Sequence, residues 1–142
     1  MPVLRAETTD DSAGILRLNA NAASVTSPMD PSKYLTLLSM RAYATVVEIE
    51  GEIVGFIMAI RDGNPHEDGI YRWFGSRLRN FIYIDRIVVD ENRRGLGIGR
   101  LLYSHLFKWS MDRQITQLTA EINIFFPMRR HLRFTILKGL LR

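Results

Sequence analysis

Residues 87–100 read IVVDENRRGLGIGR, and this stretch decides the fold. The run FIYIDRIVV at 81–89 is rich in aromatic and β-branched residues and predicts a strand. Residues 97–113 have apolar side chains at helical spacing and predict a helix. The turn between them has glycine at every second position. Such a turn lets backbone N–H groups approach an anion, and the helix dipole favours negative charge there. Three interpretations are open: a phosphate-binding loop, a mobile hinge, or a tight turn without a ligand.

Two common phosphate loops do not match this turn. The Walker loop needs Gly-Lys followed by Ser or Thr, whereas Gly99 is followed by Arg100 and Leu101. The dinucleotide pattern G-x-G-x-x-G needs its third glycine where Arg100 stands. Arg94 and Arg100 nevertheless add fixed positive charge that suits phosphate oxygens. On the glycines alone, a turn without a ligand remains open.

The remaining segments indicate an α/β protein with a largely continuous sheet. Further strands are expected at 2–7, on both sides of a Glu50-Gly51-Glu52 turn within 43–60, and at 117–125. Further helices are expected at 8–24, with Thr9 or Asp10 as N-cap, at 29–40 and at 129–142. Residues 62–80 are expected to form a long loop, and a loop of this length in a small domain is usually functional.

The composition limits the possible functions. The 142 residues suffice for one domain, and 46% apolar with 24% charged residues is typical of a globular protein. No apolar run reaches the roughly 18 residues of a membrane span, and no signal-peptide pattern is present, so we expect a cytoplasmic protein without membrane contact. The absence of cysteine excludes disulfides and thiolate metal sites. The three histidines are far apart in sequence and have no carboxylate at metal-ligand spacing, so we expect no metal.

The charge is distributed unevenly. The net charge is +4, yet the first 127 residues carry 14 basic and 15 acidic groups, while residues 128–142 hold five basic residues and no acid. A nearly neutral body with a basic tail marks a change of character after Pro127. A nucleic-acid-binding module is therefore one alternative, which a steep salt dependence of affinity would support. Because the tail offers only Phe134 for base stacking and no recognised motif, we expect no nucleic-acid partner.

The stretch IVVDENRRGLGIGRLL closely resembles the central motif of the GNAT superfamily, the acetyl-CoA-dependent N-acetyltransferases. In that family a strand leads into Arg/Gln-x-x-Gly-x-Gly/Ala, which Arg94, Gly97 and Gly99 match. The spacer has the family's length, although Glu91 stands where proline is frequent. The resemblance covers about residues 3–127. It implies the GNAT fold, an α/β (α+β) domain with a mixed, mostly antiparallel sheet flanked by helices.

The resemblance also implies where acetyl-CoA binds. Amides of residues 94–100 would wrap the pyrophosphate, and backbone groups at 87–89 would meet the pantetheine arm. The side chain of Asn123 is a candidate hydrogen-bond donor to that arm, with an ordinary strand-end asparagine as the alternative. The expected cofactor-binding residues are Ile87, Val88, Val89, Arg94, Gly95, Leu96, Gly97, Ile98, Gly99, Arg100 and Asn123.

Acetyl transfer to an amine needs a base, because a free alkylamine has a pKa near ~10, and it needs a donor for the carbonyl oxyanion. Glu121 lies on the strand after the cofactor helix, where some relatives place a catalytic glutamate. Asp85 is the second candidate, with Tyr83 on the same face of its strand. Structural roles are equally open, with Asp85 paired to Arg86 or Arg61 and Glu121 paired to a neighbouring strand.

The expected acceptor is a small-molecule primary amine. Four consecutive residues of the long loop are candidates for the wall of its pocket: Tyr71, Arg72, Trp73 and Phe74. The alternative is a loop anchored by two aromatic side chains in the core.

The family pattern breaks after Pro127. Met128 replaces an asparagine, Thr135 stands in place of the acid that protonates the leaving thiolate, and the chain ends before the family's final strands. Codons for Asn-Glu-Ala-Ser-Leu read one base later encode Met-Arg-Arg-His, the sequence at 128–131, so we hypothesise a frameshifted GNAT tail. We therefore expect one domain over 1–142, family-like to 127, with its C-terminal strands missing. The exposed sheet edge would favour a homodimer, and a pseudoenzyme that binds acetyl-CoA without turnover is the alternative function.

Overall fold

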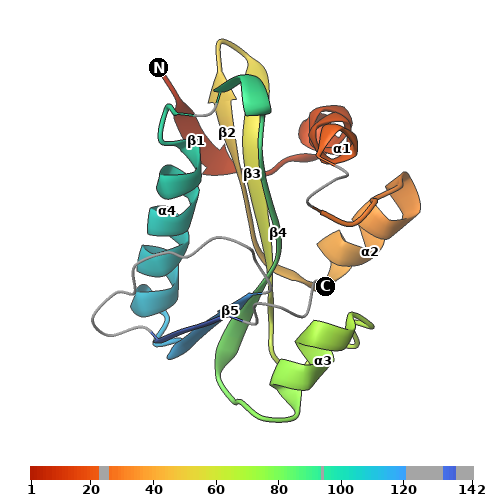
Figure 1. The fold of residues 1–142 in the computed structure, drawn as a ribbon, viewed down its shortest axis with the longest axis vertical. Helices are drawn as coiled ribbons and strands as arrows, with labels where there is room; N and C mark the ends of the chain where they lie inside the picture. The colour runs from red at the N-terminus through yellow and green to blue at the C-terminus, as the bar shows by residue number, and fades with distance from the viewer. Residues whose placement is uncertain (23–25, 94, 121–132, 137–142) are drawn as a thin grey trace.

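The computed structural model describes residues 1–22, 26–93, 95–120 and 133–136. Its strands form one six-stranded sheet whose order in space follows the chain (Figure 1). The strands are β1 Val3–Ala6, β2 Arg41–Ile49, β3 Glu52–Arg61, β4 Phe81–Val89, β5 Gln117–Ala120 and β6 Arg133–Ile136. The helices are α1 Ser12–Asn21, α2 Pro31–Met40, α3 Gly69–Gly75 and α4 Ile98–Asp112, with short 3-10 turns η1 Thr9–Asp11 and η2 Glu91–Arg93.

The sheet is mixed and mostly antiparallel, as predicted. Strands β1 to β4 pair antiparallel, while β4 with β5 and β5 with β6 pair parallel. The expected β2–β3 hairpin is present, and its two turn residues Glu50 and Gly51 have φ of 51° and 80°. Positive φ at both central residues matches the twist of the flanking strands, and glycine adopts it without steric cost.

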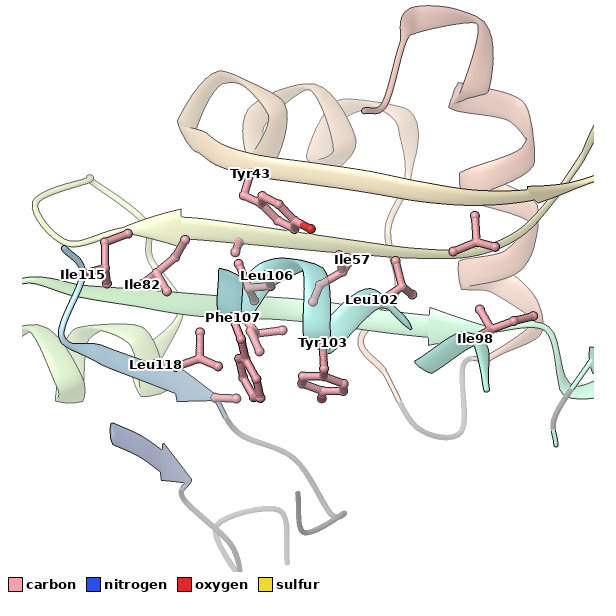
Figure 2. Close-up of a cluster of buried hydrophobic side chains, with 14 of the residues drawn as sticks. Tyr43, Ile57, Ile82, Ile98, Leu102, Tyr103, Leu106, Phe107, Ile115 and Leu118 are labelled. Carbon is pink, nitrogen blue, oxygen red and sulfur yellow. The ribbon is translucent and has the colours of Figure 1, made fainter. Parts of the chain in front are cut away.

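Helices cover both faces of the sheet (Figure 1). On one face, α4 packs over a core that includes Ile57, Leu102 and Leu106 (Figure 2). On the opposite face, α1, α2 and α3 cover a second core that includes Phe56 and Phe74. Because side chains of a strand alternate between faces, the mostly apolar strands β3 and β4 supply both cores.

The helices are short. The longest, α4, has 15 residues. Within the described ranges, no helix combines the length and the apolar character that a membrane crossing requires.

Two segments differ from the prediction. The expected long loop 62–80 contains α3, because Asp68 caps its first turn by accepting from the N–H groups of Ile70 and Tyr71, both at 2.9 Å. In the tail, residues 133–136 form strand β6 where a helix and no further strand were expected. Phenylalanine, threonine and isoleucine in this segment favour a strand. The rest of the tail, and residues 121–125 of the expected 117–125 strand, lie outside the described residues.

Candidate active site

The glycine turn joins the end of β4 to the start of α4. Gly95 and Gly97 have φ of +88° and +78°, and the carbonyl of Gly97 accepts from the N–H of Leu101 at 3.0 Å. A Cβ added at either glycine would meet no described atom within 4 Å. Glycine is therefore favoured at these two positions by the left-handed backbone conformation. The space around them would admit a larger side chain. The side of the turn on which a Cβ would stand is open. The N–H groups of the first turn of α4 come directly after it in the chain, and the first N–H groups of a helix have no partner within the helix.

The start of α4 is fixed by a close approach to Gly55 in β3. A Cβ built on Gly55 would lie 2.8 Å from Cγ2 of Ile98, 3.4 Å from the carbonyl oxygen of Val88 and 3.6 Å from Cδ1 of Leu102. Only glycine lets the first turn of α4 lie at this height above β3 and β4. Gly55 was not among the residues predicted from sequence, although a lone glycine inside an apolar strand is a known signal of close approach.

The charges around the turn are partly paired. Arg93 donates to Glu52 at 3.2 Å, next to the β2–β3 hairpin. Arg100 is exposed on the first turn of α4, and the side chain of Leu96 at the turn is 57% exposed. Arg94 lies outside the described residues. An exposed guanidinium beside a helix N-terminus favours an anionic ligand.

Strand β4 contains a bulge at Asp85. The pairing register against β3 shifts between Met58 and Ala59, so that Asp85 is the extra residue of β4. An extra residue interrupts the alternation of faces. Asp85 and Arg86 consequently both point to the face covered by α1 and α3, where their bonding partners lie. Bulges of this kind are frequent next to active sites.

A buried ion cluster forms on that face. One oxygen of Asp85 lies 2.8 Å from Nε2 of His66, and the other accepts from Nε of Arg86 at 2.8 Å. Arg86 also donates to the side chain of Asn19 at 3.0 Å and to Ser27 at 2.9 and 3.0 Å. Burial favours a raised pKa for Asp85, but the hydrogen bond with His66 and the charge and hydrogen bond of Arg86 outweigh it, so the pKa of Asp85 lies below its usual value. Asp85 is therefore a carboxylate with both oxygens engaged.

Tyr83 and Asp68 lie beside this cluster. The hydroxyl of Tyr83 donates to Asp68 at 3.3 Å. One ligand atom each of His66, Asp68 and Asp85 lies within 4.8 Å of the others, so the fold brings Asp85 beside a histidine and a carboxylate that lie two residues apart in sequence. Because Arg86 already balances the charge of Asp85, the arrangement does not require an ion.

The four candidate acceptor-wall residues divide into two pairs. Tyr71 and Phe74 are buried at 4% and 0% exposure, and burial raises the pKa of Tyr71. They anchor α3 in the core, which was the alternative interpretation. Arg72 is exposed and Trp73 is 37% exposed, with the guanidinium of Arg77 lying 4.1 Å from the centre of its ring. Only this second pair presents its side chains outward.

Glu121 and Asn123 lie outside the described residues, and their roles remain predictions. Strand β5 is described as far as Ala120, which pairs with Ile84 of β4. The last described pair of this ladder therefore lies directly before the bulge at Asp85.

Known proteins share this fold. The model of the acetyltransferase (GNAT) family matches residues 14–125. No curated protein matches the chain by sequence. Solved structures of similar fold include the ribosomal-protein-S18-alanine N-acetyltransferase of Escherichia coli (15% identity, TM-score 0.63, 83% of this chain and 64% of that one). Another is the ribosomal-protein-alanine N-acetyltransferase of Brucella melitensis (25% identity, TM-score 0.65, 84% of this chain and 74% of that one). A third is the N-acetylglutamate synthase of Neisseria gonorrhoeae complexed with coenzyme A (14% identity, TM-score 0.64, 86% of this chain and 25% of that one). The chain thus spans less than two thirds of the length of the Escherichia coli enzyme.

Proposed function

Because the chain belongs to the acetyltransferase (GNAT) family, we propose that it moves the acetyl group of acetyl-CoA to a primary amine of a small-molecule acceptor, by direct attack in a ternary complex. The family uses acetyl-CoA, which supplies an acetyl thioester: a C–N bond forms as the C–S bond breaks, and the coenzyme leaves as its thiol. We further propose that residues 1–142 act as one domain.

The turn between β4 and α4 carries this proposal. Its two left-handed glycines, Gly95 and Gly97, leave an open side, and the exposed Arg100 adds positive charge. These features fit the diphosphate of coenzyme A, because backbone N–H groups and a helix dipole bind an anion without any specific side chain. Arg94 would add a second cation, and Ile87 to Val89 would offer backbone groups to the pantetheine arm. Asn123 is proposed as a further donor to that arm.

The catalytic groups are proposed around the end of the β4–β5 ladder. Glu121 follows directly after Ala120, the last described residue of β5, and is proposed as the base that removes the proton of the amine. Asp85 is less suited to take a proton itself, because Arg86 and His66 already engage both of its oxygens. Its fixed negative charge suits it instead to orient a neighbour. Tyr83 lies beside it on β4 as a hydrogen-bonding group.

The acceptor is proposed to bind next to α3. Arg72 and Trp73 are the two residues of the predicted wall that present their side chains outward, while Tyr71 and Phe74 hold the helix in place. An aromatic ring beside a guanidinium can contact an acceptor with both apolar and acidic parts. Replacing Trp73 by alanine should therefore raise KM for the acceptor and leave the affinity for acetyl-CoA unchanged.

Release of the coenzyme thiol tests the function. The protein has no cysteine, so a thiol reagent detects only the product coenzyme. We expect thiol release from acetyl-CoA that depends on an added amine from a panel of amino acids, polyamines and aminated sugars. Mass spectrometry should show one acetyl group on the same amine. Calorimetric binding of acetyl-CoA without turnover on any member would instead support the pseudoenzyme, and absence of binding would contradict both.

A further inference from the structure

The ring of His66 is held at the bulge of β4 by three neighbours. Its Nε2 lies 2.8 Å from Asp85, and its ring centre lies 5.2 Å from that of Tyr71 and 6.4 Å from that of Tyr83. The His66 side chain is 8% exposed. No local pattern singles out this histidine, because it lies 19 residues from its carboxylate partner.

The surroundings of Asp85 determine which nitrogen of His66 carries the proton. Asp85 is ionised and bonded to Arg86, so it can only accept at its other oxygen. The neutral ring of His66 must then hold its proton on Nε2, which leaves Nδ1 as a lone-pair acceptor. A carboxylate that fixes a histidine in this way stabilises the imidazolium formed when the ring takes up a second proton.

The other ring nitrogen is free to act. Within the described part of the chain, Nδ1 of His66 has no hydrogen-bond partner. Two side-chain atoms of the described residues are fully sealed from solvent and lack a hydrogen-bond partner: Oγ of Ser110 and Oε1 of Gln117. Nδ1 of His66 is not one of them, although the side chain as a whole is 8% exposed.

The position of this pair also fits the proposed reaction. Asp85 lies two residues before Ile87, which is about 7 Å along a strand, and Ile87 begins the segment proposed for the pantetheine arm. The last described β4–β5 pair, Ile84 with Ala120, is adjacent to it. Trp73, proposed for the acceptor wall, lies on α3, which begins three residues after His66.

We propose that His66 is a catalytic residue whose Nδ1 accepts a proton from the ammonium group of the acceptor, with Asp85 as the residue that positions it. This inference rests on the proposed acetyltransferase function. Of the three ammonium protons, one passes to Nδ1 and from there to water, one is removed by the proposed base Glu121 as the C–N bond forms and ends on the sulfur of the departing coenzyme, and one stays on the amide product. Arg86 keeps Asp85 ionised, so that the pair carries one negative charge before the proton arrives.

The pH response of this site depends on every charged group that faces His66. These groups are the carboxylates of Asp85 and Asp68 and the guanidinium of Arg86, with the phenols of Tyr71 and Tyr83 beside them.

The first test reads the ring itself and needs no activity. In ¹⁵N-labelled protein the ring shifts of His66, assigned through contacts with the rings of Tyr71 and Tyr83, should show the neutral form with its proton on Nε2. The Asp85→Asn variant should shift the population toward the tautomer with its proton on Nδ1. A carboxylate can only accept from Nε2, whereas a side-chain amide can also donate to it. A proton on Nδ1 of the neutral ring in the wild-type protein would overturn the proposal.

The second test uses His66→Gln, since an amide nitrogen can replace Nε2 but cannot take up a proton. At neutral pH we expect kcat to fall by roughly 100-fold or more, with unchanged acetyl-CoA affinity by calorimetry. The variant's rate should rise about tenfold per pH unit toward the amine pKa near ~10, as free amine replaces the ammonium form. His105→Gln on α4 is the matched control and should behave as wild type, because His105 is exposed and its Nδ1 pairs with the hydroxyl of Tyr43 rather than with the groups around the bulge.

Three outcomes are decisive. An active wild type with an equally active His66→Gln variant of the same pH profile overturns the role of His66 alone. If Glu121→Gln loses activity while His66→Gln remains unaffected, Glu121 is the acceptor of the ammonium proton. This result also overturns the role proposed for His66. A wild type without any amine-dependent thiol release contradicts the proposed function, and that result is distinguishable because the tautomer measurement does not depend on turnover.

Discussion

Replacing Gly55 by alanine should disturb the proposed coenzyme site from inside the sheet. The new Cβ would lie 2.8 Å from Cγ2 of Ile98, whereas carbon atoms in contact lie about 3.5–4.0 Å apart. Ile98, and with it the first turn of α4, must therefore move by about 1 Å. The new Cβ would also lie 3.4 Å from the carbonyl oxygen of Val88, so the backbone of β4 leaves it little additional room. Overpacking of this kind costs about 1–3 kcal/mol of the free energy of unfolding.

The displacement should also weaken coenzyme binding. Hydrogen bonds from the turn lose most of their strength when a donor moves by about 1 Å, so we expect at least tenfold weaker acetyl-CoA binding, about 1.4 kcal/mol. Urea unfolding and calorimetry measure the two effects separately. Gly75→Ala is the control, because its Cβ would meet no described atom within 4 Å and it should change neither quantity.

A double variant refines this test. Ile98→Ala removes the methyl group that the new Cβ of Gly55→Ala would strike, so the two changes combined should cost less than the sum of the two single changes. Strictly additive stability losses, or a Gly55→Ala variant with wild-type stability and affinity, would refute the conclusion that Gly55 sets the position of α4.

Further predictions concern the turn, the buried carboxylate and the cap of α3. Gly97→Ala should lower stability by roughly 1–2 kcal/mol, because a residue with a Cβ must adopt φ near +78°, and Gly97→Asn should cost less, since asparagine tolerates this conformation; urea unfolding compares them. The pKa of Asp85 is lower in the folded chain than in the unfolded chain, so its contribution to stability is complete above about pH 4 and is lost as the pH falls through the folded-state value. Asp85→Asn should flatten this acid-induced loss in a pH series of unfolding curves. Asp68→Ala removes the acceptor of two helix N–H groups and should cost about 1 kcal/mol in thermal unfolding.

The parts of the fold that sequence predicted are those set by local patterns. The strand at 81–89 and the helix at 97–113 are long and have clear patterns of apolar residues, and the glycines between them indicate the turn. The structure shifts the start of this helix only to Ile98. Helix α3 was missed because it has seven residues, lies between glycines and depends on the cap at Asp68.

The buried cluster of Asp85, Arg86 and His66 could not be predicted from sequence, because it depends on a shift of the pairing register between β3 and β4. A bulge places Asp85 and Arg86 on one face, whereas regular alternation assigns neighbouring residues to opposite faces. His66 reaches Asp85 only because the segment before α3 folds back over β4. The pairing of Asp85 with Arg86 was foreseen as one alternative, but the histidine between α3 and the sheet was not.

Calorimetric titration of acetyl-CoA into wild type, Gly97→Asn and Gly99→Ala tests the central claim most directly. Gly97→Asn keeps the left-handed turn but fills the open side where the diphosphate is proposed to bind. The Cβ of Gly99→Ala would make only an ordinary contact, 3.9 Å from Cγ2 of Val89, and alanine occurs at this place in the family motif. We expect one bound acetyl-CoA in wild type and in Gly99→Ala, and at least tenfold weaker binding, about 1.4 kcal/mol, in Gly97→Asn. No binding in wild type, or equal affinity in all three proteins, would contradict the claim.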